Sequence, residues 1–391
     1  MNRAGKRFVV VAGIAVGLAA MACKGGSGGE GTVAPAPGSP GHPWHLGQPV
    51  IDSHCHVAPN LTSLARALEV FDRVGIGRFA VKSGGSVGTP RYQATMAMQK
   101  VMGDRMRVFV NLDFQGAGDP GWVDKTVRGL EQAKLDGAAG VKVFKNLGLQ
   151  VRGPDGKLIS PDDPMLDPIF EACGRLGLIF AWHIADPVAF FKPVTPDNER
   201  YDELMLAKGW QFNGPEYPSF NDLMAIQEKR IARHPKTTFL LIHMGNNAED
   251  LGYVDRLLTT YPNVHVDTSA RIPEFGRHPA DQVRAFFIKH QDRILFGSDF
   301  IADGAGDMQL GSVSHSVPTV DDAVEFFTRH WKYFETDAKQ MDHPTPIQGH
   351  WKVDAINLPD DVLKKLYVTN AERLIWSIPL PWAKATAASP K

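Results

Sequence analysis

The sequence is poor in cysteine, balanced in charge and has no apolar run that would span a bilayer comfortably. Three cysteines in 391 residues are too few to indicate a disulfide framework. The 42 lysines and arginines nearly cancel the 43 aspartates and glutamates, and neither sign gathers in one stripe or tail. This balance argues against a nucleic-acid partner, so we expect partners to be recognised at a local site. The 43% hydrophobic content is enough for a sizeable core.

The N-terminal 47 residues are expected to lie outside the folded domain. A basic stretch at 1–7 precedes an apolar run at 8–20 and small residues before Cys23. This order resembles a bacterial lipoprotein signal peptide, with Ala20 where leucine is most common. The resemblance implies a signal peptide at 1–22, lipidation of Cys23 and, at 23–47, a Gly/Pro/Ser-rich flexible tether. The alternative is an ordinary secretory signal with an incidental cysteine.

The same resemblance implies a location. Lys24 stands where lipoproteins retained at the inner membrane commonly carry aspartate. We therefore expect a protein of the cell envelope, with the outer membrane favoured, whose membrane contact is the lipid anchor alone. Residues 379–391 are expected to form a disordered tail.

Cys55 and Cys173 are expected to be small buried hydrophobic residues and not a pair. Cys55 lies between two histidines on a predicted strand, so its side chain faces away from them. Cys173 lies in a predicted helix, and nothing in the spacing favours a disulfide.

Short β-branched runs alternate with longer helical stretches from residue 48 to residue 378. Near-continuous hydrophobic strands, such as 238–242, are typical of a parallel sheet covered on both faces. Eight such strands alternating with helices predict an α/β fold, a parallel (β/α)8 TIM-type barrel. An open doubly wound sheet is the alternative, weakened because no glycine-rich phosphate loop follows the first strand. The predicted strands are 49–56, 77–82, 106–112, 138–144, 178–184, 237–243, 263–268 and 292–298, and the helices include 61–74, 122–135, 164–176, 221–234, 247–261 and 279–290.

Two predicted connections, 185–219 and 301–357, are too long to be plain turns. Both follow strands whose last residues are candidate ligands. In a barrel we expect them to be long loops over the C-terminal mouth, where they would set substrate choice. The second connection is predicted to contain a helix near 320–334.

Histidines and a carboxylate stand at the ends of the predicted strands. His54 and His56 are spaced i, i+2, which places both imidazoles on one face of the first strand. His183, His243 and Asp299 end the fifth, sixth and eighth strands. Because the carboxyl ends of barrel strands meet at one mouth, these side chains are predicted to converge.

Imidazoles and a carboxylate suit a divalent ion of the zinc type that keeps an open position for water. Such an ion lowers the pKa of its water towards about 7 and polarises a carbonyl oxygen. Asp299 could bind the metal and accept a proton from the water. His243 could polarise the substrate or act as acid or base near neutral pH.

The ordered set of motifs resembles the amidohydrolase superfamily. It is most similar, over about 49–378, to the amidohydrolase-related branch that includes aminocarboxymuconate semialdehyde decarboxylase. The motifs are Asp-x-His-x-His at 52–56, His183, His243-Met244-Gly245, Gly297-Ser298-Asp299 and Asn-Ala-Glu-Arg-Leu at 370–374. The resemblance implies His54, His56, His183 and Asp299 as ligands of one zinc-like metal and His243 as a catalytic residue beside them. Members of the branch include hydrolases and nonoxidative decarboxylases.

Lys142 is a further candidate on the fourth strand. Two-metal members of the superfamily carry a carbamylated lysine on this strand, which bridges the metals, so Lys142 or Lys145 could play that part. The alternatives are a lysine that binds a substrate carboxylate or one that forms an internal ion pair.

Other residues are open to two interpretations. Asp267 ends the seventh strand and could hold a histidine in its correct tautomer or cap a turn. Arg271 and Trp182 could line the mouth. The second connection carries four histidines that we interpret as surface or lid residues, because their spacing matches no compact metal site: His315, His330, His343 and His350.

We therefore expect a metal-dependent hydrolase that uses a metal-activated water on a small carbonyl substrate, such as an amide, ester or lactone. One alternative keeps the site but changes the chemistry, to nonoxidative decarboxylation. Another is an inactive lipoprotein that uses the barrel as a binding scaffold, which is disfavoured because every ligand position carries a competent residue. The ligands alone do not separate hydrolysis from decarboxylation, and the sequence leaves a homodimer open.

Overall fold

The computed structural model describes residues 44–383. The predicted signal peptide, Cys23, most of the predicted tether and most of the predicted tail lie outside this range. All eight predicted strands are present, each within a few residues of its predicted position. They are β1 (Val50–Val57), β2 (Ile76–Val81), β3 (Met106–Asn111), β4 (Gly140–Val143), β5 (Ile179–Trp182), β6 (Phe239–Leu241), β7 (Val264–Asp267) and β8 (Ile294–Leu295).

These strands form one curled sheet in which each strand pairs in parallel with the next, from β1 to β8. Two backbone hydrogen bonds join the segment that follows β8 to strand β1. Ser53 N–H donates to the carbonyl oxygen of Phe296 at 2.9 Å, and Asp299 N–H donates to that of His54 at 2.8 Å. The sheet therefore curls far enough to bring its eighth strand beside its first, as the barrel prediction requires.

Two short strands extend the sheet beyond β1 and were not predicted. β9 (Phe300–Ala302) pairs in parallel with β1, and β10 (Met308–Leu310) pairs antiparallel with β9. Both have three residues, too few to show a periodic pattern, and they lie inside the second long connection.

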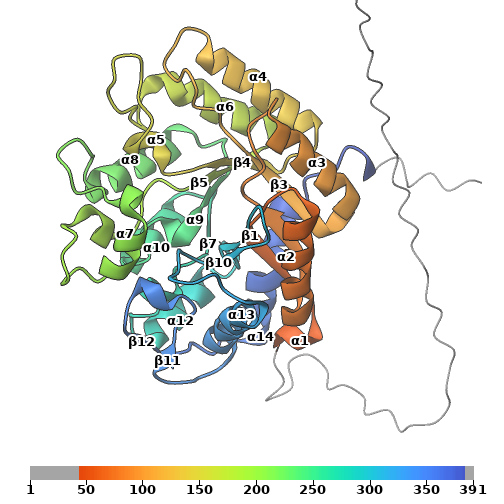
Figure 1. Ribbon diagram of the computed structural model, residues 1–391, viewed down its shortest axis with the longest axis vertical. Coiled ribbons are helices and arrows are strands. Elements are labelled where there is room, and N and C mark those ends of the chain that lie inside the picture. Colours follow the sequence, from red (N-terminus) through yellow and green to blue (C-terminus); the bar gives the residue numbers. More distant parts are fainter. Residues whose placement is uncertain (1–43, 384–391) are drawn as a thin grey trace, which may run out of the picture. The chain divides into compact units, whose positions relative to one another are not determined.

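Helices surround the strands, which lie at the centre of the view in Figure 1. The predicted helices are all present, and α2 coincides with its predicted range. Asn60 fixes its start by accepting a hydrogen bond from Ser63 N–H, and Gly75 ends it in the left-handed conformation. The longer helices are α2 (Leu61–Val74), α3 (Pro90–Met102), α4 (Trp122–Leu135), α6 (Asp167–Leu176), α8 (Phe220–Arg233), α10 (Leu251–Thr260), α12 (Ala280–Lys289) and α13 (Val320–Glu335).

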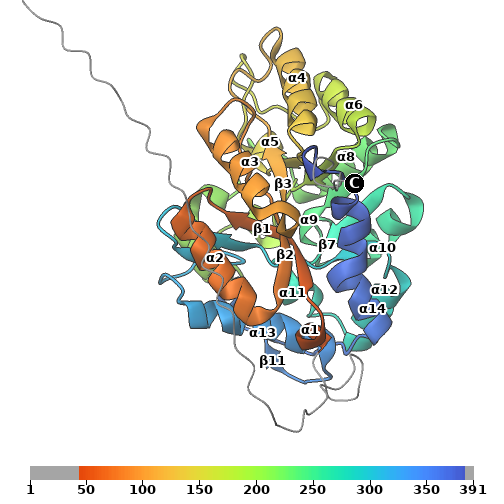
Figure 2. The same cartoon turned by 90° about the vertical axis from the view of Figure 1, so that its right-hand side faces the viewer.

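A small inner core fills the curled sheet, and the C-terminal helical segment covers one end of it (Figure 2). α14 (Asp360–Lys364) continues through π-helical turns at 365–369 and 372–376. Asn370 donates to the carbonyl oxygen of Ile294 at 2.8 Å, where β8 begins. Ala371 and Ile375 complete the inner core, whose other members come from the strands: Ile51, Ala80, Phe109, Ala139, Ile179, Ala181, Leu240, Ile242 and Leu295. This segment therefore closes the amino ends of the strands and leaves the carboxyl ends for a site.

The two long connections contain structure of their own. The first holds α7 (Tyr201–Leu206) between short 3-10 turns at 188–191 and 208–210. The second holds β9, β10, the predicted helix α13 and a hairpin of β11 (Met341–Asp342) with β12 (Lys352–Val353). α13 packs on α2, with the rings of Phe327 and Phe71 6.2 Å apart, so this helix covers the sheet and not its mouth.

The prediction that the histidines of the second connection are surface or lid residues is wrong for two of them. His330 is buried on the inner face of α13, where Nδ1 contacts the Phe326 carbonyl oxygen at 2.8 Å. His343 is also buried, with Nε2 3.0 Å from the Gly349 carbonyl oxygen. Spacing alone missed this because α13 is amphipathic and His330 falls on its apolar face.

The folded domain begins before residue 48. Residues Trp44–Gly47, which belong to the predicted tether, form the short helix α1 instead. Trp44 is buried with its ring 5.3 Å from that of Tyr367, so burial of a large aromatic ring holds this segment on the domain. Cys55 and Cys173 are buried and free, as predicted. Within residues 44–383, no helix has the length and apolar character needed to cross a membrane.

His330 is expected to make stability depend on pH. Burial lowers its pKa to about 4 from an ordinary value of 6.5. Between these values the unfolded chain binds a proton that the folded protein excludes, so the free energy of unfolding falls as the pH drops from 7 towards 4. We expect His330→Leu to reduce the loss between pH 7 and pH 5 by on the order of 2 kcal/mol, as measured by urea unfolding at both values. His315→Leu, at an exposed position, is the control; equal pH dependence in wild type and His330→Leu would contradict this account.

Candidate metal centre

The histidine pair of β1 meets Asp299 at the carboxyl end of the sheet. His54 is buried and His56 is half-buried, with ring centroids 5.4 Å apart. Asp299 Oδ1 lies 3.4 Å from His54 Nε2 and 3.2 Å from His56 Nε2. Burial raises the pKa of Asp299, but the two imidazoles outweigh it, and the pKa lies well below its usual value. One nitrogen of each histidine and one oxygen of Asp299 lie within 4.8 Å of one another, close enough to share an ion.

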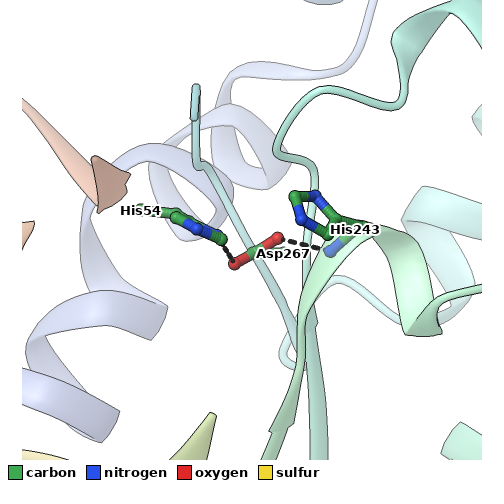
Figure 3. A group of neighbouring side chains, drawn as sticks. All are labelled: His54, His243 and Asp267. Carbon is green, nitrogen blue, oxygen red and sulfur yellow. Dashed lines mark hydrogen bonds and ion pairs between the residues drawn. The ribbon is translucent and has the colours of Figure 1, made fainter. Parts of the chain in front are cut away.

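Asp267 fixes which nitrogen of His54 faces this group. Its Oδ2 lies 2.9 Å from His54 Nδ1, and its Oδ1 accepts a hydrogen bond from His243 N–H at 2.9 Å (Figure 3). Burial lowers the pKa of His54 to about 4, so the ring is neutral at pH 7. With the single proton on Nδ1 beside the carboxylate, Nε2 carries the lone pair that a metal needs.

Asp267 plays both of the parts that the sequence allowed, since it holds a histidine ring and also fixes a turn. Besides holding His54, its Oδ1 accepts hydrogen bonds from the Ser269 hydroxyl at 2.6 Å and from Ser269 N–H at 3.3 Å, which fixes the turn after β7. Asp267, His54 and His243 also form a second group with metal-like spacing. In that group Asp267 already accepts from both partners, so the His54, His56 and Asp299 group is the better metal site.

His243 lies beside the group but is held differently. It sits in a short turn, Ile242–Gly245, in which His243 and Met244 both have positive φ values of 57° and 54°. Its Nδ1 is 2.9 Å from the carbonyl oxygen of Ser269, an acceptor, so Nδ1 carries the proton. Burial holds the pKa of His243 well below its usual value. Nε2 is therefore an unprotonated nitrogen in a residue that lines the cavity.

His183 lies next to His243, with ring centroids 4.5 Å apart, but belongs to neither metal-like group. Its Nε2 lies 3.1 Å from Asp186 Oδ1, and its buried Nδ1 has no hydrogen-bond partner among the described residues. Sequence reasoning missed Asp186. The available signal was its position three residues after a histidine at a strand end.

The two candidate lysines, Lys142 in β4 and Lys145 just after it, have different surroundings. Lys142 is buried with Nζ 3.5 Å from His54 Nε2, and burial lowers its pKa to about 8. Lys145 forms an internal ion pair with Asp186 and lies 4.0 Å from the centre of the Trp210 ring. Of the two, Lys142 is the lysine that faces the histidines.

A cavity of about 190 Å³ opens beside these residues. Arg271 lines it, as one sequence interpretation had it, but Trp182 does not. Trp182 points to the other side of β5 and is buried against Phe170 and Phe239. Each long connection contributes to the wall: Phe190, Glu203 and Trp210 from the first, and Ile301, Gln309, Gly311, Ser312 and Gln348 from the second. A cavity of about 150 Å³ holds benzene, so this one suits a single small ring or a molecule of that size.

The donor set fits a divalent ion. His54 offers Nε2 with Nδ1 secured on a carboxylate, Asp299 offers an ionised oxygen, and His183 has a buried nitrogen without a partner. Neutral imidazoles and carboxylates in this number are typical of zinc and related ions.

The comparisons with known proteins identify the family. The amidohydrolase family model matches residues 51–375. The chain belongs to the amidohydrolase family. It is an amidohydrolase-family enzyme. The matched residues include all four candidate ligands, His54, His56, His183 and Asp299. No curated protein matches the chain.

Several solved structures are similar to the chain at low sequence identity. An uncharacterised TIM-barrel protein from Bordetella bronchiseptica is 14% identical, with a TM-score of 0.50, over 84% of this chain and 99% of its own. A dihydroxybenzoic acid decarboxylase from Polaromonas with bound manganese is 15% identical, with a TM-score of 0.47, over 84% and 97%. An amidohydrolase from Burkholderia multivorans with bound zinc is 14% identical, with a TM-score of 0.44, over 85% and 100%. The first of these supports a TIM-barrel fold for this amidohydrolase.

Replacing Asp267 is expected to destabilise the fold as well as the site. Asp267→Asn removes a buried charge that accepts hydrogen bonds from His54, His243 and Ser269, so we expect a loss of about 2–4 kcal/mol in the free energy of unfolding. Urea unfolding without added metal measures this loss. Asp281→Asn, at an exposed position of α12, is the matched control and should change stability by less than about 0.5 kcal/mol. Equal stability of the two variants would show that Asp267 does not support the site.

Proposed function

We propose that the protein is a metal-dependent hydrolase that holds one divalent ion, of the zinc type, through His54, His56, His183 and Asp299. The observation that carries this proposal is the convergence of His54, His56 and Asp299, with ligand atoms within 4.8 Å. Asp267 supports it by holding the proton of His54 on Nδ1, which leaves Nε2 with its lone pair. The substrate would be a small carbonyl compound such as an amide, ester or lactone.

Each residue of the site has a separate role in such a reaction. The bound ion would supply Lewis acidity, which acidifies water and polarises a carbonyl. Asp299 accepts the proton of the attacking water, and His243 moves a proton at Nε2 or hydrogen-bonds the substrate oxygen, because its Nδ1 is committed to Ser269. Lys142 and Arg271 orient the substrate from the cavity wall.

Nonoxidative decarboxylation is the second candidate, and two of the three lysine and arginine side chains that line the cavity favour it, because Lys145 is already paired with Asp186. Lys142 and Arg271 both line a cavity of about 190 Å³ that the candidate ligands His56, His183 and Asp299 line as well. A carboxylated aromatic or enol substrate would place its charge near these cations and the metal. Hydrolysis and decarboxylation need the same Lewis acid and the same neighbouring proton donor, so substrates must separate them.

Location and assembly are proposals from the sequence. We propose that Cys23 carries a lipid that anchors the domain to the cell envelope, in the outer membrane, and that the loops beside the cavity lie over the mouth and set substrate choice. The partner is a small-molecule substrate, with no nucleic acid, and a homodimer is compatible with this proposal.

The metal content of the purified protein tests the proposal first. We expect about one zinc-like ion per chain by elemental analysis, and less than a tenth of that in the double variant His54→Ala/His56→Ala, which lacks two of the ligands. His315→Ala, which removes an exposed histidine outside the group, should keep full occupancy. Two ions per chain would instead support a carbamylated Lys142. A folded protein that binds no metal after incubation with zinc would overturn the proposal.

Activity then separates the two chemistries. The zinc-loaded protein, the chelated protein and the double variant should be assayed against simple lactones, aryl esters and anilides, and against hydroxylated benzoates with detection of released CO2. Hydrolysis that needs both metal and histidines supports the first candidate. CO2 release with the same dependence supports the second, and metal binding without either reaction leaves the scaffold interpretation.

A further inference from the structure

Asp186 is a buried carboxylate on which three side chains from different strands converge. Lys145, after β4, forms an ion pair with its Oδ2. His183, after β5, places Nε2 3.1 Å from its Oδ1, and Arg271, after β7, places a guanidinium nitrogen 3.8 Å from the same oxygen. All four side chains are buried and line the cavity.

This arrangement determines the state of the His183 ring. A neutral imidazole carries one proton, on either Nδ1 or Nε2, and a carboxylate beside one of these nitrogens decides which. Asp186 forms an ion pair with Lys145, so it is a carboxylate that can only accept hydrogen bonds. The proton of His183 therefore lies on Nε2, between the ring and Asp186. Nδ1 is left with a lone pair, buried and without a partner among residues 44–383.

A buried acceptor without a partner needs an explanation, because such groups are rare in folded proteins. The candidate ligands supply it. The His183 ring lies 4.5 Å from that of His243, which lies 5.2 Å from that of His54, so the ring with its buried Nδ1 lies beside the metal-like group. Asp186 itself is a poor ligand, because both of its oxygens already accept from protein donors.

We propose that Asp186 is a positioning residue that holds His183 in the Nε2–H tautomer and so presents Nδ1 to the metal. It would do for His183 what Asp267 does for His54, with the roles of the two ring nitrogens exchanged. The inference rests on the proposed function, since it assigns a residue that serves the same metal.

A positioning role for Asp186 can be distinguished from a purely stabilising one by comparing the removal of Lys145 with the removal of the Asp186 carboxylate. Lys145 is held by more than Asp186: its ammonium lies 4.0 Å from the centre of the Trp210 ring. It pairs with Oδ2 of Asp186, whereas His183 contacts Oδ1, so removing Lys145 should cost stability but leave the His183–Asp186 contact in place. Removing the carboxylate should change the tautomer of His183.

Long-range 1H–15N spectra of the protein with 15N-labelled histidine report the tautomer directly. In the metal-free wild type, the His183 signals, assigned by their absence in His183→Gln, should show a protonated Nε2 and an unprotonated Nδ1. In Asp186→Asn the amide can donate as well as accept, so the Nδ1–H tautomer should become populated. On addition of zinc to the wild type, the His183 signal that shifts should be Nδ1, whereas His54 should respond at Nε2.

Metal affinity supplies the second readout. Zinc binding measured by competition with a chelator should weaken 10- to 100-fold in Asp186→Asn, and the visible spectrum of bound Co2+ should change. Lys145→Met should bind zinc within threefold of the wild type while unfolding at lower urea. Asp255→Asn is the matched control, because Asp255 contacts His290 Nε2 at 2.7 Å and Lys289 on outer helices; its zinc affinity should be unchanged.

Several outcomes would overturn the inference. These are a proton on Nδ1 of His183 in the metal-free wild type, zinc coordination at Nε2 of His183, or an Asp186→Asn variant with unaltered affinity and Co2+ spectrum. Equal weakening in Lys145→Met would assign the effect to the ion pair. If the wild type binds no zinc at all, the proposed function fails; the metal-free tautomer then still decides whether Asp186 positions His183.

Discussion

The backbone hydrogen bond from Asp299 N–H to the His54 carbonyl oxygen, at 2.8 Å, joins the end of the eighth strand to the first. The candidate site depends on it, because it brings a carboxylate beside two imidazoles that precede it by more than 240 residues. Close approach is possible because residue 297 is glycine: a Cβ there would lie 2.9 Å from the Cβ of His54. Asp299 itself adopts a φ of 63°, which aims its side chain back at the histidines.

The site concentrates features that destabilise a fold when they lack partners. His243, Met244 and Asp299 have positive φ, each at a cost of about 1–3 kcal/mol, and several ionisable groups are buried. The structure offsets these costs by pairing. Asp267 accepts from His54, His243 and Ser269, and Asp186 accepts from Lys145 and His183. Each carboxylate holds one histidine ring, so the pairing that keeps the charges buried also orients candidate ligands.

Much of the fold and part of the site follow from sequence. The strands were predictable because both of their faces are buried and they read as continuous apolar runs, and helices such as α2 because their caps and periodicity agree. The i, i+2 pair of histidines and the carboxylate after β8 were predictable from strand geometry alone.

The remaining features depend on contacts between residues far apart in sequence. Which nitrogen of His183 is free is decided by Asp186, and the burial of His330 by the packing of α13 on α2. Trp182 lies on the same strand end as His183 but points to the other side of β5, so its sequence position could not reveal whether it lines the cavity. The short strands β9 and β10 are defined by pairing with β1 and not by any pattern of their own.

The location of a bound ion tests the central claim most directly. Crystals of the protein grown with zinc should be measured at the zinc absorption edge, and an anomalous difference map should be calculated from those data. The account predicts one peak about 2.0–2.2 Å from His54 Nε2, His56 Nε2, His183 Nδ1 and an Asp299 oxygen. A map with no peak at this point, or with its only peak elsewhere on the protein, would contradict it.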